Sequence, residues 1–250
     1  MSRGFYNLAS GMLTQQRKID ISSNNIANLN TAGYKKEQAV TSNFSNLLIN
    51  KVKQNGIEED SQQLSGVSVI RTVVENNTLH SQGTLEETGN MTDFAIKGAG
   101  FFAVDNNGQI VYTRNGSFNI DMEGYLVLEG TGRVQGEFGD IYIGSDKFDF
   151  AEDGSIIVED EVVDNIAVYD FFDYNDLNKY GEGMFISNVE PELLDYPVIV
   201  NKTIERSNVN LTEELTGIIS SQRALQTASQ ALKIYDMINE KAVTEIGKIG

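Results

Sequence analysis

Cysteine is absent from this 250-residue chain, and histidine occurs once, at His80. The lack of any thiol excludes a disulfide framework, a thiolate metal site and a cysteine nucleophile. With one histidine, the chain also lacks the usual ligand set of a zinc or other transition-metal site. We therefore expect no metal and no other cofactor.

Long apolar runs are missing as well. No stretch reaches the roughly 18 consecutive apolar residues that a membrane-spanning helix needs. Polar residues 15–18 (QQRK) interrupt the N-terminal region before the apolar core of a signal peptide is complete, so nothing here indicates secretion by the general route. An apolar fraction of 40% nevertheless permits a folded core in a chain of this length.

The formal net charge of −17 is unevenly distributed along the chain. Residues 1–40 carry a net +3 and residues 201–250 a net 0, which leaves −20 for the middle. An acidic middle repels phosphate backbones and anionic lipids, so we expect neither a nucleic-acid partner nor a role at a lipid surface. The two terminal segments carry little net charge and the middle segment is strongly acidic. This pattern indicates that the terminal segments form contact surfaces and that the middle segment is solvated.

Both ends of the chain have the three-and-four spacing of a helix stripe. At the N-terminus the stripe consists of Phe5, Leu8, Met12, Gln15, Ile19, Ser22, Ile26 and Leu29. At the C-terminus it consists of Ile218, Ser221, Leu225, Ala228, Leu232, Tyr235, Asn239, Ala242, Ile246 and Ile249. These patterns predict a helix over about residues 3–28, ended by turn-forming residues, and a longer one over 211–246.

The second predicted helix has a capping sequence and an unusual length. Asn210 is placed to accept from the amide near Glu213 while the Glu213 side chain reaches back, a variant of the capping box. At about 1.5 Å per residue this helix would be on the order of 50 Å long, which exceeds the width of a small domain. Part of it must project or pack on something else.

Between the helices the pattern changes to short apolar segments separated by turn sequences, which predicts β-structure over about residues 67–205. Residues 101–128 have the turns of a meander. Further strands are predicted at 67–74, 94–96, 141–143, 156–158, 166–169 and 184–186. Residues 35–66 are polar and predict a connector with one short helix marked by Phe44, Leu47, Leu48 and Val52.

The predicted fold class is therefore α+β, with long, coiled-coil-like N- and C-terminal helices that flank a central, mainly antiparallel β-domain. We divide the chain into an N-terminal helical assembly segment (1–34), the connector (35–66), a β-rich outer domain (67–206) and a C-terminal assembly helix (207–250). The bounds follow the changes of periodicity just described.

Catalytic and ligand-binding patterns are weak. His80 lies in a polar segment, which predicts a solvated loop or edge histidine instead of a catalytic base. The acidic pairs Asp170 with Asp173, and Glu152 with Asp153, are expected from composition alone in so acidic a chain. We therefore predict that the protein is not an enzyme and has no small-molecule substrate.

Two short motifs suggest a ligand but fit a turn better. Residues 105–108 (DNNG) resemble the start of a calcium loop, yet Gly116 stands where the loop needs a bidentate glutamate. Residues 98–100 (GAG) are followed by a predicted strand, whereas a dinucleotide fingerprint leads into a helix. Both are predicted to be tight turns.

Three groups of motifs resemble one known family. They are residues 9–13 (ASGML), 15–16 (QQ) and 24–35 (NNIANLNTAGYK) at the start, 88–90 (TGN), 93–96 (DFAI), 98–102 (GAGFF) and 112–118 (YTRNGSF) in the middle, and 207–211 (SNVNL), 213–215 (EEL) and 222–225 (QRAL) at the end. Together they resemble the rod, hook and hook-associated axial proteins of the bacterial flagellum. Leu225, where the family commonly has an aromatic residue, and Thr216, where an apolar one is usual, depart from the pattern.

The resemblance covers nearly the whole chain and implies a structural subunit of the flagellar basal body. Shorter rod proteins lack the β-domain and the hook protein has an extra outer domain, so the chain is most similar to distal-rod proteins or the longer proximal-rod proteins. The resemblance further implies export through the flagellar type III apparatus, with both helices lining a torque-transmitting helical tube. The implied partners are copies of the chain and other axial proteins.

The expected assembly residues lie in these terminal motifs: Leu8, Met12, Gln15, Gln16, Asn24, Asn25, Asn28, Asn30, Gly33, Tyr34, Asn208, Asn210, Gln222, Arg223 and Leu232. Asparagine side chains both donate and accept, so they can satisfy loose backbone groups of their own chain or of a neighbour. From spacing alone, the two helices can equally pair within one monomer. An exported carboxylate-dependent cell-wall glycan hydrolase, and a hook-type or adhesin subunit, are the alternative functions.

Overall fold

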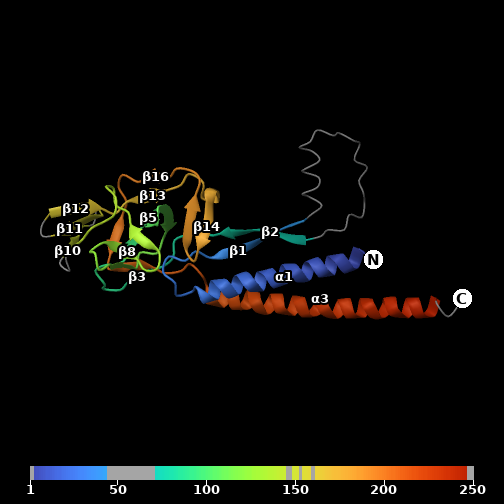
Figure 1. Cartoon of the computed structure of the whole chain (residues 1–250). Helices are drawn as coiled ribbons and strands as arrows, with labels where there is room; N and C mark the ends of the chain where they lie inside the picture. Colours follow the sequence, from blue (N-terminus) through green and yellow to red (C-terminus); the bar gives the residue numbers. More distant parts are fainter. Residues whose placement is uncertain (1–2, 44–70, 145–147, 152–153, 159–160, 247–250) are drawn as a thin grey trace, which may run out of the picture. The chain divides into compact units, whose positions relative to one another are not determined.

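The computed structural model describes residues 3–43, 71–144, 148–151, 154–158 and 161–246. It separates into two compact units. The helical unit comprises Met1–Ile26, Glu37–Leu79 and Asn210–Gly250, and the β unit comprises Ala27–Lys36 and His80–Val209. An N-terminal helix, a central antiparallel β-domain and a C-terminal helix confirm the α+β class (Figure 1).

The helical unit contains the two long helices, α1 (Arg3–Ala27) and α3 (Leu211–Ile246). Their bounds confirm the predicted helices. The Asn210 half of the predicted capping box is confirmed, because its carboxamide oxygen accepts from the backbone amides of Thr212 at 3.0 Å and Glu213 at 3.3 Å. The C-terminal end of α1 lies beside the start of α3, and α3 runs past the N-terminal end of α1 (Figure 1).

A two-stranded ribbon completes the helical unit. Strand β1 (Glu37–Asn43) pairs antiparallel with β2 (Arg71–Thr78), so that Glu37 lies opposite Thr78. The prediction that residues 35–66 form a polar connector was therefore wrong at its start, because a strand begins at Glu37. The short helix predicted around residues 44–52 lies outside the described residues.

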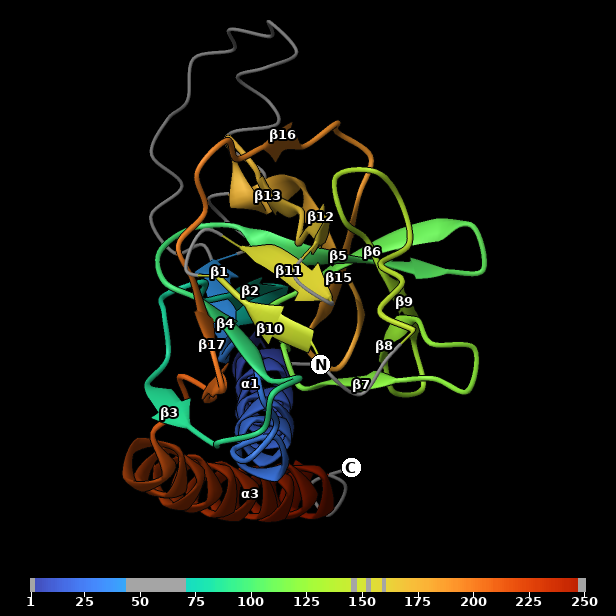
Figure 2. The ribbon, with the colours of Figure 1, turned by 90° about the vertical axis from the view of Figure 1, so that its left-hand side faces the viewer.

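The β unit is built on a nine-stranded sheet with the main order β14-β15-β6-β5-β9-β8-β7, to which β13 and β16 add beside β5. The bounds of its strands are β5 (Phe101–Asn106), β6 (Gln109–Thr113), β7 (Phe118–Ile120), β8 (Leu126–Leu128), β9 (Gly132–Val134), β13 (Val168–Asp170), β14 (Leu177–Gly181), β15 (Met184–Ser187) and β16 (Glu192–Leu193). One 3-10 turn, η1 (Tyr174–Asp176), precedes β14. Figure 2 looks along this unit.

Three smaller sheets accompany the large one. A three-stranded sheet joins β10 (Phe148–Phe150), β11 (Ser155–Val158) and β12 (Glu161–Asn165), and the pairs β3 (Leu85–Glu87) with β18 (Thr203–Glu205) and β4 (Phe94–Ile96) with β17 (Ile199–Asn201) form the others. All of their pairings are antiparallel. Residues 88–93, between β3 and β4, thus lie close to the loop between β17 and β18.

Most of the predicted strands are present, including β4 over its predicted residues and the 101–128 meander. Residues 141–143 were predicted as a strand, but only an isolated bridge from Tyr142 to Tyr125 is found there. The apolar side chains of Ile141 and Ile143 are nevertheless buried, which explains the strand-like pattern. Of the predicted strand at 67–74, residues 71–74 lie in β2 and 67–70 lie outside the described residues.

Strand β5 has apolar side chains on both faces, so it lies at the centre of the β unit. Phe102 and Val104 join the larger core, which also contains Phe94, Leu126, Ile156 and Val168 among others. Phe101 and Ala103 point the other way and pack with Tyr112, Phe171 and Phe185. The two cores bury the sheet on both sides at this point.

Neither described helix combines the length and hydropathy that crossing a bilayer requires.

Candidate assembly site

Three charged side chains meet inside the β unit, and they come from the beginning, middle and end of the chain. The Glu205 carboxylate accepts from the Lys35 ammonium at 2.6 Å and from the Arg114 guanidinium at 3.2 Å. All three side chains are at most 4% exposed. We call Lys35, Arg114 and Glu205 the charged hub; it joins motifs that are far apart in sequence.

The charged hub also has backbone partners, whereas the buried Nε of Arg114 has no hydrogen-bond partner among the described residues. Glu205 also accepts from the amide of Gly83 at 2.7 Å, Lys35 donates to the carbonyl of Ser81, and Arg114 donates to the carbonyl of Gly98. Burial lowers the pKa of the Lys35 ammonium, while the charge of Glu205 and its hydrogen bond oppose that shift. Two cations against one carboxylate leave a net positive charge in the interior.

Gly33 and Tyr34 hold the N-terminal motif against this hub. The amide of Gly33 donates to the backbone carbonyl of Glu205 at 2.7 Å. Gly33 has φ +69°, and a Cβ at this position would overlap the backbone of Arg114 and Asn115. Tyr34 is buried, with the Lys179 ammonium 5.5 Å from its ring centroid. Only glycine fits position 33 without strain.

Two of the predicted asparagines replace missing backbone partners within the chain. Asn25, which is fully buried, donates to the carbonyl of Glu37 at 2.8 Å and accepts from its amide at 3.0 Å, like one rung of a β-ladder. Asn208 accepts from the amide of Lys36 at 2.7 Å and donates to the carbonyl of Ser81 at 3.0 Å. Asn208 thereby joins the C-terminal motif to segments distant in sequence, and Asn25 joins α1 to the start of β1.

Asn28 and Asn30 also have partners inside the β unit. The Asn28 carboxamide oxygen accepts from the Thr31 hydroxyl at 3.1 Å, and that of Asn30 accepts from Arg206 at 3.4 Å. One half of the asparagine hypothesis, bonding within the same chain, is thus present. Bonding to a neighbouring subunit stays a prediction.

Parts of both predicted helix stripes are covered within the chain. Leu8, Met12 and Gln15 of α1 and Leu232 of α3 are half-buried, and Ser221 is buried. A Cβ on Gly217 would lie 3.9 Å from the Ser22 hydroxyl oxygen, so the helices approach closely there. The stripes therefore contribute to packing within one subunit. Six of the predicted assembly residues are exposed: Gln16, Asn24, Asn30, Asn210, Gln222 and Arg223.

A second apolar stripe on α3 was missed in the sequence. Leu211, Leu215 and Ile219, and further along Ile234 and Met237, are each 41–54% exposed. Together with three glutamines between them (Gln222, Gln226 and Gln230), they are spaced three or four residues apart, so the sequence already contained this second helix stripe. It was overlooked because the first stripe already accounted for the helix.

His80 lies in a loop, but the prediction that it is solvated was wrong. Its ring packs against Phe101, Tyr174 and Phe185 with centroid distances of 5.0–5.8 Å. Burial, with smaller contributions from Lys35 and Arg114, lowers the pKa of His80 from 6.5 to about 4. Residues distant in sequence supply this environment, so the polar neighbours of His80 did not indicate it.

The acidic pair that the structure describes, Asp170 and Asp173, makes local hydrogen bonds. Asp170 accepts from the Tyr174 hydroxyl at 2.9 Å, and Asp173 caps the turn η1 by accepting from the amide of Asn175. Glu152 and Asp153 lie outside the described residues. No cluster of three potential metal ligands occurs in the described part of the chain.

The two suggestive glycine motifs are turns, as predicted. Asn107 and Gly108 both have positive φ between β5 and β6, and the Gly108 amide donates to Asp105 at 2.6 Å. Such backbone angles are typical of a two-residue hairpin loop. Gly98 and Gly100 also have positive φ and lead into β5.

Three family models match segments of this chain. The Flagella basal body rod protein model matches residues 5–35, the Flagellar hook protein FlgE/F/G D1 domain model matches residues 95–163, and the Flagellar basal body rod FlgEFG protein C-terminal model matches residues 200–245. The matched segments include the three charged-hub residues and nearly all of both helices.

Curated relatives extend the similarity over almost the whole length. The flagellar basal-body rod protein FlgG of Buchnera aphidicola subsp. Acyrthosiphon pisum is 31% identical over 93% of this chain and 95% of its own. FlgG of Bacillus subtilis is 29% identical over 97% and 98%, and the rod protein FlgF of Caulobacter vibrioides is 29% identical over the full length of both. The chain therefore belongs to the flagellar basal-body rod protein family, as a structural subunit of the basal body.

Proposed function

We propose that this rod protein polymerises through its helical unit, with copies of itself and with other axial proteins of the flagellum. The product is a helical tube in which α1 and α3 line the inside, the β unit faces outward, and torque is transmitted along the axis. A contact repeated head to tail without ring closure generates such a helix. Export through the flagellar type III apparatus delivers the subunits.

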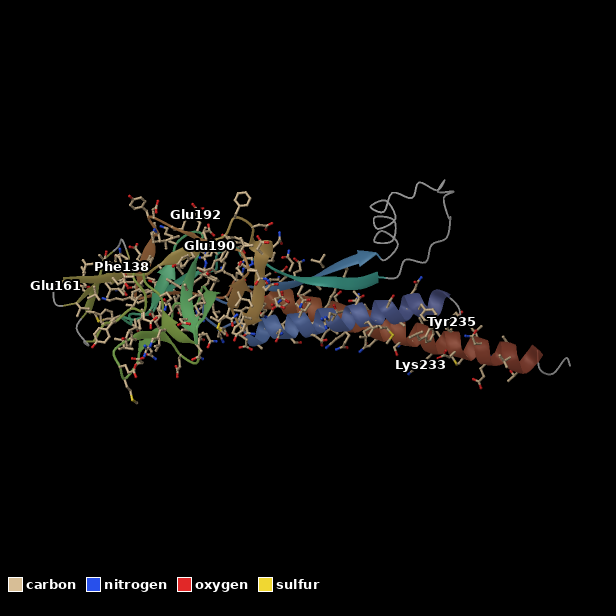
Figure 3. All side chains as sticks on the ribbon, turned by 45° about the horizontal axis from the view of Figure 1, so that its top comes forward. Phe138, Glu161, Glu190, Glu192, Lys233 and Tyr235 are labelled. Atoms are coloured by element: carbon tan, nitrogen blue, oxygen red, sulfur yellow. The ribbon has the colours of Figure 1, made fainter. Side chains whose placement is uncertain are left out.

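The main support for this proposal is the uneven distribution of charge between the helical unit and the β unit. The β unit contains 25 acidic and 9 basic residues, a net −16, whereas the helical unit contains 11 acidic and 10 basic, a net −1. Glu161, Glu190 and Glu192 are exposed examples on the β unit (Figure 3). Copies of the helical unit can therefore approach each other closely, and copies of the β unit repel.

The composition of the helices supports packing of many copies. Gln15, Ser22 and Ser221 interrupt the apolar stripes, which makes them poor seams for a dry two-stranded coiled coil. Ser220, Ala224 and other small residues of α3 permit close approach of backbones. Helix α3 is 36 residues long and α1 is 25, so about 16 Å of α3 extends beyond any cover that α1 can supply.

We further infer that the subunit works without catalysis. The Asp170 and Asp173 carboxylates are engaged in local hydrogen bonds, and the only histidine is held among aromatic rings. These contacts support a structural part for the β unit and give no support to a glycan hydrolase.

Deletion of the gene in the source bacterium tests the proposal. Basal bodies imaged by electron microscopy should stop at an incomplete rod, and the cells should be non-motile. Expression of the intact chain in the same strain is the control and should restore both. Complete rods and hooks in the deletion strain would contradict the proposal and favour a surface adhesin.

A further inference from the structure

Asparagine is followed directly by glycine at three places in this chain, 55–56, 107–108 and 115–116. Asparagine is thermally labile, and a glycine after it leaves its carboxamide most open to attack, because no Cβ shields the glycine nitrogen. The first pair lies outside the described residues. The other two pairs lie in the β unit, and their surroundings differ in the features that decide this chemistry.

The reaction of such a pair is deamidation, which needs no enzyme and no cofactor. The backbone nitrogen of the glycine attacks the carboxamide carbon of the asparagine, so that a new N–C bond forms and the bond to Nδ2 breaks. The proton from the glycine nitrogen leaves with the amide nitrogen as ammonia. Solvent water then opens the cyclic imide to aspartate, or to isoaspartate, in which the backbone runs through the former side chain.

The first described pair, Asn107 and Gly108, forms the exposed tip of the hairpin between β5 and β6. The two residues have φ of 53° and 90°. Apart from its chain neighbours, no heavy atom of the described residues lies within 4 Å of the position that a Cβ on Gly108 would take. The Asn107 carboxamide donates to that of Asn106 at 3.2 Å, also on the surface. An exposed hairpin tip opens locally at a small free-energy cost, which lets the glycine nitrogen reach the carboxamide.

The second described pair, Asn115 and Gly116, is held on every side. Gly116 is buried, its carbonyl accepts from the Phe94 amide at 2.9 Å, and a Cβ there would overlap the Phe94 carbonyl oxygen. The Asn115 carboxamide oxygen accepts from the Ser117 amide at 3.0 Å, and the Asn115 amide donates to the Thr113 hydroxyl at 3.0 Å. The attack at Asn115 therefore requires several of these bonds to break together.

One contact at the hairpin tip acts directly on the attacking nitrogen. The Gly108 amide donates to the Asp105 carboxylate at 2.6 Å. A hydrogen bond to an ionised acceptor is stronger than one between neutral groups. Loss of the proton from Gly108 would also place a negative nitrogen beside the negative carboxylate. Asp105 therefore opposes the step that starts the reaction.

We propose that Asn107 is a site of spontaneous deamidation in the folded chain, and that Asp105 limits its rate. The product carries one more carboxylate, which changes the net charge of the β unit from −16 to −17. An isoaspartate at position 107 lengthens the backbone of a two-residue loop, so it also weakens the pairing of β5 with β6. The modification thus lowers the stability of the β unit and raises the repulsion between copies of it.

Ageing of the purified full chain at neutral pH, followed by tryptic digestion and mass spectrometry, tests the site. Trypsin cleaves after Arg114, so Asn107 and Asn115 are read on different peptides. In the folded chain Asn107 should deamidate at least fivefold faster than Asn115. In urea, where both pairs are unfolded, the two rates should agree within twofold. A ratio in the folded chain that is no greater than the ratio in urea would overturn the assignment.

Asp105→Asn in the full chain tests the restraint on the rate. The new carboxamide has the same shape and still accepts, so circular dichroism should show wild-type folding, but it has no negative charge. Deamidation of Asn107 should become at least threefold faster, with that of Asn115 unchanged. A rate at Asn107 equal to or below that of the wild type would overturn the role of Asp105, as would equal acceleration at both sites.

Asp173→Asn is the matched control for this variant. The Asp173 carboxylate likewise accepts from a backbone amide in a turn, that of Asn175 at 2.9 Å in η1. This variant should leave the rate at Asn107 unchanged. Acceleration as large as that of Asp105→Asn would show that loss of any surface carboxylate has the same effect, and it would overturn the specific role of Asp105.

Discussion

The half-buried His80 makes the stability of the β unit depend on pH, and a single substitution can separate its contribution from that of the other titrating groups. In the folded chain the pKa of His80 is about 4, against 6.5 for an unperturbed histidine. The unfolded chain therefore binds the proton first as pH falls. Stability should decrease as pH drops from about 6.5 towards 4, since the neutral ring is the form that fits beside Lys35, Arg114 and the aromatic rings.

The size of the effect follows from this difference in pKa. At pH 5 the unfolded histidine is almost fully protonated and the folded one is mostly neutral, which is worth at most about 2 kcal/mol. Because the ring is only half-buried and solvent screens part of the interaction, we expect about 1 kcal/mol.

Urea unfolding of the wild type and of His80→Phe, followed by near-ultraviolet circular dichroism of the tyrosines, measures the effect. Phenylalanine preserves an aromatic ring in contact with Tyr174 but cannot titrate. The free-energy difference between the two proteins should shift by about 1 kcal/mol in favour of the variant between pH 7.5 and 5. Parallel stability curves, or an NMR titration of the single histidine near pH 6.5, would refute the reasoning.

Three further predictions concern the charged hub, the N-terminal motif and charge repulsion. Glu205→Gln should lower the free energy of unfolding in urea by about 3–5 kcal/mol, because it leaves two buried cations without a counter-charge. Glu86 forms an exposed ion pair, so Glu86→Gln should change the free energy of unfolding little. Gly33→Ala should lower the free energy of unfolding by about 2–4 kcal/mol, because a Cβ at position 33 strains the backbone and overlaps its neighbours. Gly89 also has a positive φ but has open space around it, so Gly89→Ala should lower the free energy of unfolding by only about 1 kcal/mol. Equal losses for the two variants would show that position 33 is not crowded. Assembly, followed by light scattering, should become more favourable as the salt concentration rises from low to physiological, because salt screens the repulsion between acidic β units. If the scattering falls steadily as salt is added, ion pairs between subunits dominate the contact.

The features set by local periodicity were predictable from sequence. Helix α3 was predicted over its observed residues because the three-and-four spacing continues from the Asn210 cap to Ile246. Strand β4 was predicted for the same kind of reason, a short apolar segment between turn sequences. In both cases the pattern that determines the element lies within the element.

The features set by distant partners were not predictable. Strand β1 has little alternation of its own and is held by β2 and by the Asn25 side chain. The charged hub joins Glu205 to residues 170 and 91 positions away, and isolated charges normally indicate solvent exposure. The surroundings of His80 have the same origin, because its ring contacts come from β5, η1 and β15.

Cryo-electron microscopy of isolated basal bodies from the source bacterium tests the central claim most directly. At a resolution that separates helices, copies of α1 and α3 should line the inside of the axial tube, with the acidic β units outside. A tube in which β units form the inner wall, or basal bodies that lack this chain altogether, would contradict the account.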